Sequence, residues 1–395
     1  MRSNGTEGGR KNPASFLKDR EIRSLKGIPT VLSRMQPRDL SSHQEYVPGR
    51  GVEEVAAAHG MDPADLVTLS SNENPLGPSD AAIDAIASHV DSVHRYPKAS
   101  HLELTDALAD HWNLDRSQVW VASGGDGALD YLSRAVLEPG DRVLVPRPGF
   151  AYYGMSARFH HGDVDTYELS QSTGFEMTAP GVLGDYDGHR IVYVTSPHNP
   201  TGRTMALDEL EMLAEQTDEE TLVVVDEAYG EFADTGGARE LLDGRDDIAV
   251  LRSFSKAYGL AGLRLGYALV PEAWGDAYIR VNTPFAVNEL ACRAGVAALG
   301  ASEHLERGID LARWGRTYLG EELSVHTWPS EGNFVLVDVG DASRVAAQLI
   351  PRGYIVRDCT SFGLPSCIRI TIGRQEATRG VATALDEVAA EVANR

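Results

Sequence analysis

Lysine is rare in this sequence of 395 residues, and one of the few lysines lies in a stretch that could bind an anion. From Met35 to the C-terminus the chain contains two lysines, Lys98 and Lys256. Lys256 lies in RSFSKAYGLAGLRLG, residues 252–266, between two serines and a run of glycines. A lysine amine can form a Schiff base with an aldehyde, which arginine cannot do. A lysine kept here therefore indicates amine chemistry, although a surface lysine is the alternative when the residue is considered alone.

Two stretches offer groups that bind phosphate. Next to Lys256, the hydroxyls of Ser253 and Ser255 and the guanidinium fork of Arg264 could together hold a phosphate. Farther upstream, SGGDG at 123–127 opens an expected helix, so its backbone N–H groups and the helix dipole both favour an anion. An ordinary glycine turn explains this second stretch equally well when it is considered alone.

Another group of residues could surround an aromatic ring. Asp226 ends the apolar run LVVVD, so its carboxylate should be desolvated and needs a partner such as a pyridinium N–H. Tyr229 and Asn199 could contact a ring oxygen, and Phe150 could stack on the ring. Taken singly, these residues are equally well a capping aspartate, a packed tyrosine, a turn asparagine and a core phenylalanine. Together with Lys256 and the phosphate-binding groups, they fit pyridoxal phosphate bound through lysine.

These candidate residues follow short apolar runs that alternate with helical patterns. Such alternation is typical of βαβ units and a mostly parallel sheet, whose ligands bind beyond the carboxyl ends of the strands. Pro146 is expected to stop the second strand of this sheet. The expected strands lie within 118–136, 141–153, 190–202, 221–230, 249–256 and 263–270.

The pattern changes after about residue 285. A helical stretch there leads to three short expected strands, which indicates a smaller α+β domain. These strands lie within 333–339, 353–359 and 367–373. The predicted organisation is a leader (1–34), an N-terminal arm (35–74), a large cofactor-binding α/β domain (75–285) and a small C-terminal domain (286–395).

The composition excludes several classes of function. With 36 Lys and Arg against 58 Asp and Glu, the formal net charge is −22, so attraction to nucleic acid or anionic lipid is not expected. The same charge suggests a cytosol of high ionic strength, where salt screens self-repulsion. The three cysteines form no C-x-x-C pair, so neither a disulfide framework nor a zinc site is indicated, and no metal is expected. No run of about 18 apolar residues predicts a membrane span.

The first 34 residues differ from the rest, with eight Lys or Arg against three Asp or Glu. They contain no apolar core resembling a signal sequence. Two interpretations remain, a disordered leader or untranslated sequence upstream of a true start at Met35, and the second is favoured.

Several motifs carry a resemblance to a known family. SFSKAYGLAGLRLG, SPHNPTG (196–202) and DEAY (226–229) resemble the motifs of class I and II aminotransferases, which have the type I pyridoxal-phosphate fold. Further stretches narrow the resemblance to histidinol-phosphate aminotransferases. They are YVPGRGVEEVAAAHG (46–60), LSSNENPLGPS (69–79), RYP (95–97), IVRDC (355–359) and IRITIG (368–373). The resemblance covers residues from about 40 to 390.

This resemblance implies a role for each matching residue that would touch the cofactor. Lys256 would carry pyridoxal phosphate as a Schiff base and shuttle the proton. Asp226, Asn199 and Tyr229 would hold the ring, with Phe150 at the position of the family's stacking aromatic residue. The cofactor phosphate would be held by Ser253, Ser255, Arg264 and the amides of Asp126 and Gly127. One departure is SGGDGALD (123–130), where many relatives have GADEGIE; little effect is expected because the backbone makes the contact.

The resemblance also implies a partner subunit and two substrates. Tyr96 would reach the phosphate of the neighbouring subunit's cofactor and Tyr46 would border the substrate there, so both require a homodimer. Arg369 and Arg357 would take the anionic end of the substrate. The implied reaction transfers an amino group between L-histidinol phosphate and 2-oxoglutarate in histidine biosynthesis, in the cytoplasm, while the cofactor alternates between its pyridoxal and pyridoxamine forms.

Four other functions are alternatives to this one. Within the same fold, an aromatic or other amino-acid aminotransferase and a threonine-phosphate decarboxylase are the nearest alternatives. The decarboxylase would be expected to have NINP where this chain has NENP (72–75), so Glu73 favours the aminotransferase. A non-catalytic regulator module would usually carry a DNA-binding segment, which the acidic chain does not offer. A dehydrogenase is disfavoured because no G-x-G-x-x-G follows a strand.

Overall fold

The computed structural model describes residues 40, 41, 43, 45–47, 49 and 51–393. The predicted leader, residues 1–34, lies outside the described residues, as does part of the predicted arm. Residues His43–Arg395 form one compact unit.

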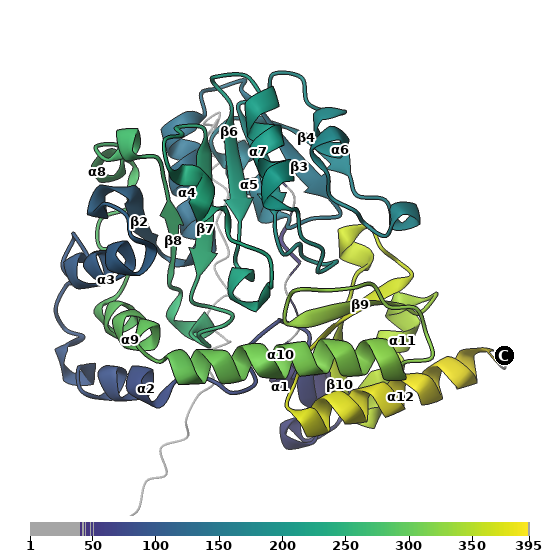
Figure 1. The fold of residues 1–395 in the computed structure, drawn as a ribbon. Helices are drawn as coiled ribbons and strands as arrows, with labels where there is room; N and C mark the ends of the chain where they lie inside the picture. The colour runs from purple at the N-terminus through teal and green to yellow at the C-terminus, as the bar shows by residue number, and fades with distance from the viewer. Residues whose placement is uncertain (1–39, 42, 44, 48, 50, 394–395) are drawn as a thin grey trace, which may run out of the picture. The chain divides into compact units, whose positions relative to one another are not determined.

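A seven-stranded sheet, the large sheet, forms the centre of this unit (Figure 1). β8 is antiparallel to β2 and β7, and the remaining pairs are parallel, so six strands run in one direction. Most of these strands are buried along their whole length, as expected of parallel strands covered on both faces. The order is β2 (Val119–Ala122), β8 (Gly266–Leu269), β7 (Ile248–Ser253), β6 (Leu222–Asp226), β5 (Ile191–Thr195), β3 (Arg142–Arg147) and β4 (Asp163–Glu168).

Alternate residues of each strand enter two separate cores, one on each face of the large sheet. In β6, for example, Val223 and Val225 belong to one core, whereas Leu222 and Val224 belong to the other. The first core is covered by α2 (Asp80–Ala87), α3 (Leu102–Trp112), α6 (Ala179–Leu183), α7 (Leu207–Gln216) and α9 (Glu289–Leu299). The second is covered by α4 (Gly124–Val136), α5 (Tyr152–Phe159) and α8 (Tyr278–Val281). The result is a three-layer αβα arrangement.

A four-stranded sheet, the small sheet, has its own core. Its order is β1 (Val67–Leu69), β10 (Tyr354–Asp358), β11 (Cys367–Thr371) and β9 (Phe334–Asp338), with β1 parallel to β10 and the other pairs antiparallel. This core also contains side chains of α10 (Ser302–Glu322), α11 (Ala342–Leu349) and α12 (Gln375–Ala393). Figure 1 shows α10 and α12 side by side along the small sheet. The short helix α1 (Val52–His59) packs on a separate small cluster that includes Ile355 of β10.

The fold class predicted from the sequence is confirmed, and every predicted strand is present. One detail is wrong, because Pro146 does not stop β3, which continues to Arg147. The physical reason is the pairing on either side of this residue. β3 pairs with β4 along its whole length but with β5 only at Val143 and Leu144, so at Pro146 no ladder partner on the β5 side needs the missing N–H.

The packing of β1 and α9 differs from the grouping implied by the predicted domain limits. β1, which the prediction placed in the N-terminal arm, is an edge strand of the small sheet. α9 lies after the predicted boundary near residue 285, yet it packs on α2 and α3 of the large-sheet core. The boundary remains a prediction, and this packing favours a later position at the start of α10.

Candidate active site

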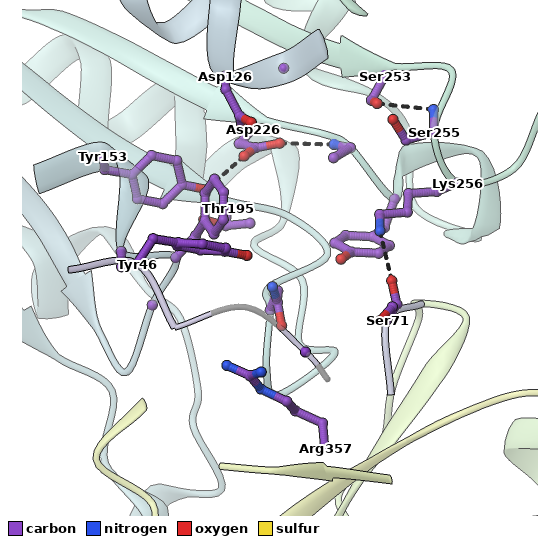
Figure 2. Close-up of a pocket in the computed structure, with 18 of the residues that line it drawn as sticks. Tyr46, Ser71, Asp126, Tyr153, Thr195, Asp226, Ser253, Ser255, Lys256 and Arg357 are labelled. Carbon is purple, nitrogen blue, oxygen red and sulfur yellow. Dashed lines mark hydrogen bonds between the residues drawn. The ribbon is translucent and has the colours of Figure 1, made fainter. Parts of the chain in front are cut away.

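A cavity of about 290 Å³ lies between the carboxyl ends of the large-sheet strands and the small sheet. On one side it is lined by residues that follow β3, β5, β6 and β7 and by the start of α4. On the other side it is lined by residues after β1, by Arg357 of β10 and by Arg369 of β11. Figure 2 shows Asp226, Lys256 and Arg357 directed into the same space. The position agrees with the rule that parallel sheets bind ligands at their carboxyl edge.

Lys256, in the loop after β7, is half-buried in this cavity. Its Nζ donates a hydrogen bond to the backbone oxygen of Ser71 at 3.0 Å and lies 5.7 Å from the centre of the Tyr229 ring. Burial, followed by the nearby positive charge of Arg369, lowers the pKa of Lys256 to about 8. A substantial fraction of the amine is therefore neutral near physiological pH, which is the form that attacks a carbonyl and accepts a proton.

Asp226 ends β6 and is 5% exposed. Its Oδ1 accepts from the backbone N–H of Ala228 at 2.9 Å, and its Oδ2 accepts from the Tyr153 hydroxyl at 2.6 Å. Burial raises the pKa of Asp226 to about 6, against the effect of these two hydrogen bonds. Among the described residues no cation pairs with this carboxylate, so the site fits a ligand that brings a protonated ring nitrogen.

Three more predicted ring contacts line the cavity. The Tyr229 hydroxyl accepts a hydrogen bond from Asn72 Nδ2 at 3.0 Å. Asn199 Oδ1 accepts from the guanidinium of Arg369, which leaves the Asn199 amide N–H groups for a ligand oxygen. Phe150 lines the cavity just before α5, and its ring lies edge-on to that of Tyr153, with the ring centres 5.5 Å apart.

Asn72 connects the two sheets. Its backbone N–H donates to Thr371 Oγ1 at 2.9 Å, and its backbone oxygen accepts from Asn333 Nδ2 at 3.0 Å. The residue has a φ of 54°, in the left-handed region that asparagine tolerates better than most residues. Asn72 therefore fixes Tyr229, which follows β6, against the strands of the small sheet.

The predicted phosphate site is formed by the loop after β7 and the first turn of α4. Ser253, Ser255 and Arg264 line the cavity there, and Arg264 Nη2 lies 3.1 Å from Asp126 Oδ2. Gly124 is needed for this approach, because a Cβ at that position would lie 2.5 Å from Arg264. The unpaired N–H groups of the first turn make this end of α4 suited to an anion.

One member of the predicted phosphate site does not reach the cavity. Gly125 and Asp126 line it, whereas Gly127 does not. The physical reason is the position of Gly127 as the fourth residue of α4, where its N–H group begins the intrahelical hydrogen bonds.

Two arginines lie side by side at the end of the cavity formed by the small sheet. Arg357 of β10 and Arg369 of β11 are cross-strand partners, so their side chains emerge side by side. Arg357 donates to the Val47 backbone oxygen at 2.9 Å and to Ser361 Oγ at 3.1 Å. Arg369 is 5% exposed and donates to the Ser70 backbone oxygen at 2.6 Å, and its buried Nε has no partner among the described residues. Two adjacent guanidinium groups repel each other, which favours a dianionic ligand.

Residues 64–385 match the family model for aminotransferase class I and II. This chain belongs to that family. A histidinol-phosphate aminotransferase of Halorubrum lacusprofundi is 62% identical over 358 residues, which cover 91% of this chain and 98% of the relative. One from Haloarcula marismortui is 60% identical over 91% of this chain and 99% of the relative.

A solved structure agrees with these sequence matches. The histidinol-phosphate aminotransferase of Sinorhizobium meliloti, in complex with pyridoxal 5'-phosphate, superposes with a TM-score of 0.81 at 27% identity. The match covers 92% of the aminotransferase described here and 99% of the Sinorhizobium chain.

Two tyrosines of the aminotransferase were predicted to act in the neighbouring subunit. Tyr46 lines the cavity of its own chain (Figure 2), and its role at the substrate of a partner subunit stays a prediction. Its ring centre lies 6.1 Å from that of Phe150 in an edge-on arrangement, and the neighbouring Val47 backbone oxygen accepts a hydrogen bond from Arg357 at 2.9 Å. Tyr96 lies outside this cavity, is 84% exposed and packs on Phe285 at 5.0 Å, so its role in a partner subunit remains a prediction.

The sequence did not single out several residues that the structure places in the site. Ser71 accepts the hydrogen bond of Lys256, and Tyr153 and Thr195 bond to each other beside Asp226. Tyr153 offered no clear signal, because a tyrosine in the first turn of a helix such as α5 is ordinary core composition. Ser71 offered no signal either, because its backbone oxygen makes the contact.

Proposed function

We propose that this aminotransferase transfers the amino group between L-histidinol phosphate and 2-oxoglutarate, with pyridoxal phosphate as cofactor. The observation that carries the proposal is the adjacent pair of arginines, Arg357 and Arg369, at the end of a cavity that also contains Lys256. A phosphate ester carries two negative charges near neutral pH, which matches two guanidinium groups. The names of the relatives that match nearly the whole chain support the same substrate.

The residues of the cavity fit pyridoxal phosphate. Asp226, which lacks a cationic partner among the described residues, would bind the ring nitrogen, and Asn199 and Tyr229 would contact the ring oxygen. When bound, the cofactor supplies an electron-withdrawing ring that makes the Cα–H of the amino donor acidic. Lys256 would anchor it, and the phosphate would be held by Ser253, Ser255, Arg264 and the first turn of α4.

The chain's own groups can carry the proton transfer. Lys256 Nζ has a pKa lowered to about 8, so it can take a proton from the donor carbon and return it near neutral pH. Phe150 would cover one face of the ring and keep the donor on the side of Lys256. The same two arginines serve both half-reactions, because a guanidinium fork binds phosphate and carboxylate alike.

The proposal also covers the assembly of the enzyme and its location in the cell. The enzyme acts as a homodimer in which Tyr96 reaches the cofactor phosphate of the partner subunit, and its exposure of 84% leaves it free to do so. It works in the cytoplasm. Among the described residues, no helix combines the length and apolarity needed to cross a membrane.

A steady-state comparison of amino donors tests this function. L-histidinol phosphate should give the highest kcat/KM with 2-oxoglutarate as acceptor, above phenylalanine and tyrosine, because these lack the dianionic group. Threonine phosphate should release no carbon dioxide. A higher kcat/KM for phenylalanine or tyrosine would contradict the proposal in favour of an amino-acid aminotransferase, and carbon dioxide release would point to a decarboxylase.

A further inference from the structure

We propose that Tyr153 is a positioning residue that keeps the Asp226 carboxylate oriented and ionised, with Thr195 setting the direction of the Tyr153 hydroxyl. The inference rests on the cofactor chemistry of the proposed function. It does not depend on which amino donor the enzyme uses, since none of these groups is assigned to the substrate.

The hydrogen bonds among these three residues have a defined direction. Tyr153 is 1% exposed, and its Oη lies 2.6 Å from Asp226 Oδ2 and 2.7 Å from Thr195 Oγ1. A phenol has one proton to donate, and the carboxylate can only accept. Since that proton is given to Asp226, the Thr195 hydroxyl must donate to Tyr153 Oη. The chain of donors therefore runs from Thr195 through Tyr153 to Asp226, three residues that Figure 2 draws close together.

The surrounding structure fixes this chain of donors. Thr195 and Asp226 are register partners on the adjacent strands β5 and β6, so the sheet sets their separation. The Tyr153 ring stacks on Tyr193, with ring centres 4.8 Å apart and an interplanar angle of 12°. It also lies edge-on to Phe150, with ring centres 5.5 Å apart. The phenol therefore cannot rotate away without disturbing both contacts.

Charge explains why Asp226 needs this donor. Burial, with a smaller contribution from the negative charges of Asp126 and Glu227, raises the pKa of its carboxyl group to about 6. The Tyr153 hydroxyl and the Ala228 N–H act in the opposite direction. Loss of the hydroxyl should therefore raise the pKa of Asp226 toward neutral pH, so that a much larger fraction of the carboxyl group is protonated at pH 7 and unable to pair with a ring cation. The titratable groups around it are Tyr153 of α5, Asp126 of α4, Glu227 and Tyr229 after β6, and Lys256 after β7.

Binding of pyridoxal phosphate to the apoenzyme tests the role without any amino donor. The dissociation constant would be measured from pH 5 to 9 for the wild type, Tyr153→Phe and Thr195→Val. Tyr153→Phe should weaken binding about tenfold at pH 7, the size of a lost hydrogen bond to a charged group. The pH below which binding is lost should rise by about one unit. Thr195→Val should act in the same direction but less strongly. The cofactor's own phosphate titrates alike in all variants, so the shift between variants is the readout.

Tyr193→Phe is the matched control. Tyr193 is also fully buried and belongs to the same aromatic stack, but its hydroxyl contacts Ser133 Oγ at 3.4 Å instead of Asp226. This variant should bind pyridoxal phosphate with the wild-type pH profile. If the wild type binds pyridoxal phosphate and Tyr153→Phe binds it with the same pH profile, the inference is overturned while the proposed function stands. An equal loss of cofactor affinity in Tyr193→Phe and Tyr153→Phe would overturn the inference in the same way. A wild-type apoenzyme that does not bind the cofactor would overturn the proposed function as well.

Discussion

Burial moves the ionisable groups of this site in opposite directions. It lowers the pKa of Lys256 to about 8 and raises the pKa of Asp226 to about 6, because a low-dielectric cavity disfavours either charge. The two pKa values thus approach neutral pH from opposite sides. After burial, the largest influence on the pKa is Arg369 for the lysine and the Tyr153 hydroxyl for the aspartate.

The two lysines downstream of Met35 allow a controlled test of the covalent anchor. Lys256→Ala should lower kcat by roughly 10³-fold or more, because both the anchor and the proton-transfer group are lost. Its thermal unfolding should stay close to that of the wild type. Borohydride reduction followed by peptide mapping should place the pyridoxyl group on residue 256. Lys98→Ala is the control, because Lys98 is exposed and paired with Glu103, and its kcat should not change. A pyridoxyl group found on Lys98 would disprove the assignment.

The lowered pKa of Lys256 predicts a pH dependence for loading the apoenzyme. The amine must be neutral to attack the aldehyde, so the rate of covalent attachment should rise with pH and level off above about 8. Stopped-flow absorbance would follow the reaction. Arg369→Gln removes the positive neighbour with the largest effect, so the rise should move to higher pH.

Arg357→Gln is the matched variant for that experiment. Arg357 lines the same cavity but is absent from the main influences on Lys256, so the midpoint should stay near that of the wild type. The same midpoint in all three proteins would show that Arg369 does not set the basicity of Lys256.

Among the elements, those that carry the cofactor residues were the most predictable. Fully buried parallel strands such as β5 and β6 have continuous apolar sequences bounded by polar turns, and both were found from this pattern. β1 has three residues and β4 alternates with charged side chains, so neither has a comparable pattern. Their pairing is decided by contacts with distant strands.

The candidate site was predictable where chemistry demands one residue type. Lys256 and Asp226 stood out because an amine and a desolvated carboxylate are unusual in their surroundings. The motifs did not show that Tyr46 lines the cavity of its own chain or that Gly127 lies outside it, because these positions depend on the path of the chain and on the helix register. Tyr153 was missed because a buried tyrosine beside an aromatic residue is ordinary core composition.

The contact between β8 and the first turn of α4 should be sensitive to a single methyl group. A Cβ at Gly266 would lie 2.5 Å from the backbone carbon of Gly124, so Gly266→Ala must displace the turn that forms the phosphate site. We expect a loss of about 1–3 kcal/mol in unfolding free energy. The affinity for pyridoxal phosphate should also fall. Calorimetry and a cofactor titration would measure the two effects.

Gly262→Ala serves as the control for this substitution. It lies four residues before Gly266, and its Cβ would have nothing within 4 Å. Stability should be unchanged or slightly higher, because alanine restricts the unfolded chain. Equal cofactor affinity in the two alanine variants would show that the contact between Gly266 and Gly124 does not shape the phosphate site.

At the scale of the whole molecule, the net charge of −22 sets the response to salt. The relatives from halophilic organisms support a salt adaptation of this chain. Self-repulsion of the acidic surface is screened over a Debye length of about 10 Å at 0.1 M and about 3 Å at 1 M salt. The melting temperature at pH 7 should therefore rise by several degrees between 0.1 M and 2 M potassium chloride.

The same scan at about pH 5 is the control, because many carboxylates are then protonated and the net charge is much smaller. The stabilisation by salt should shrink accordingly. A melting temperature that is independent of salt at pH 7 would contradict the interpretation of the acidic composition as a salt adaptation.

Asn72 has a consequence for building chimaeric enzymes. It bonds to Thr371, which lies 299 positions later, and also to Asn333, while its own segment continues from β1. A designer who replaces only the C-terminal third with that of a relative would combine one lineage's asparagine with another's threonine. Grafts of this region should therefore exchange residues 67–74 together with 333–371, as one module assembled from two distant pieces of the gene.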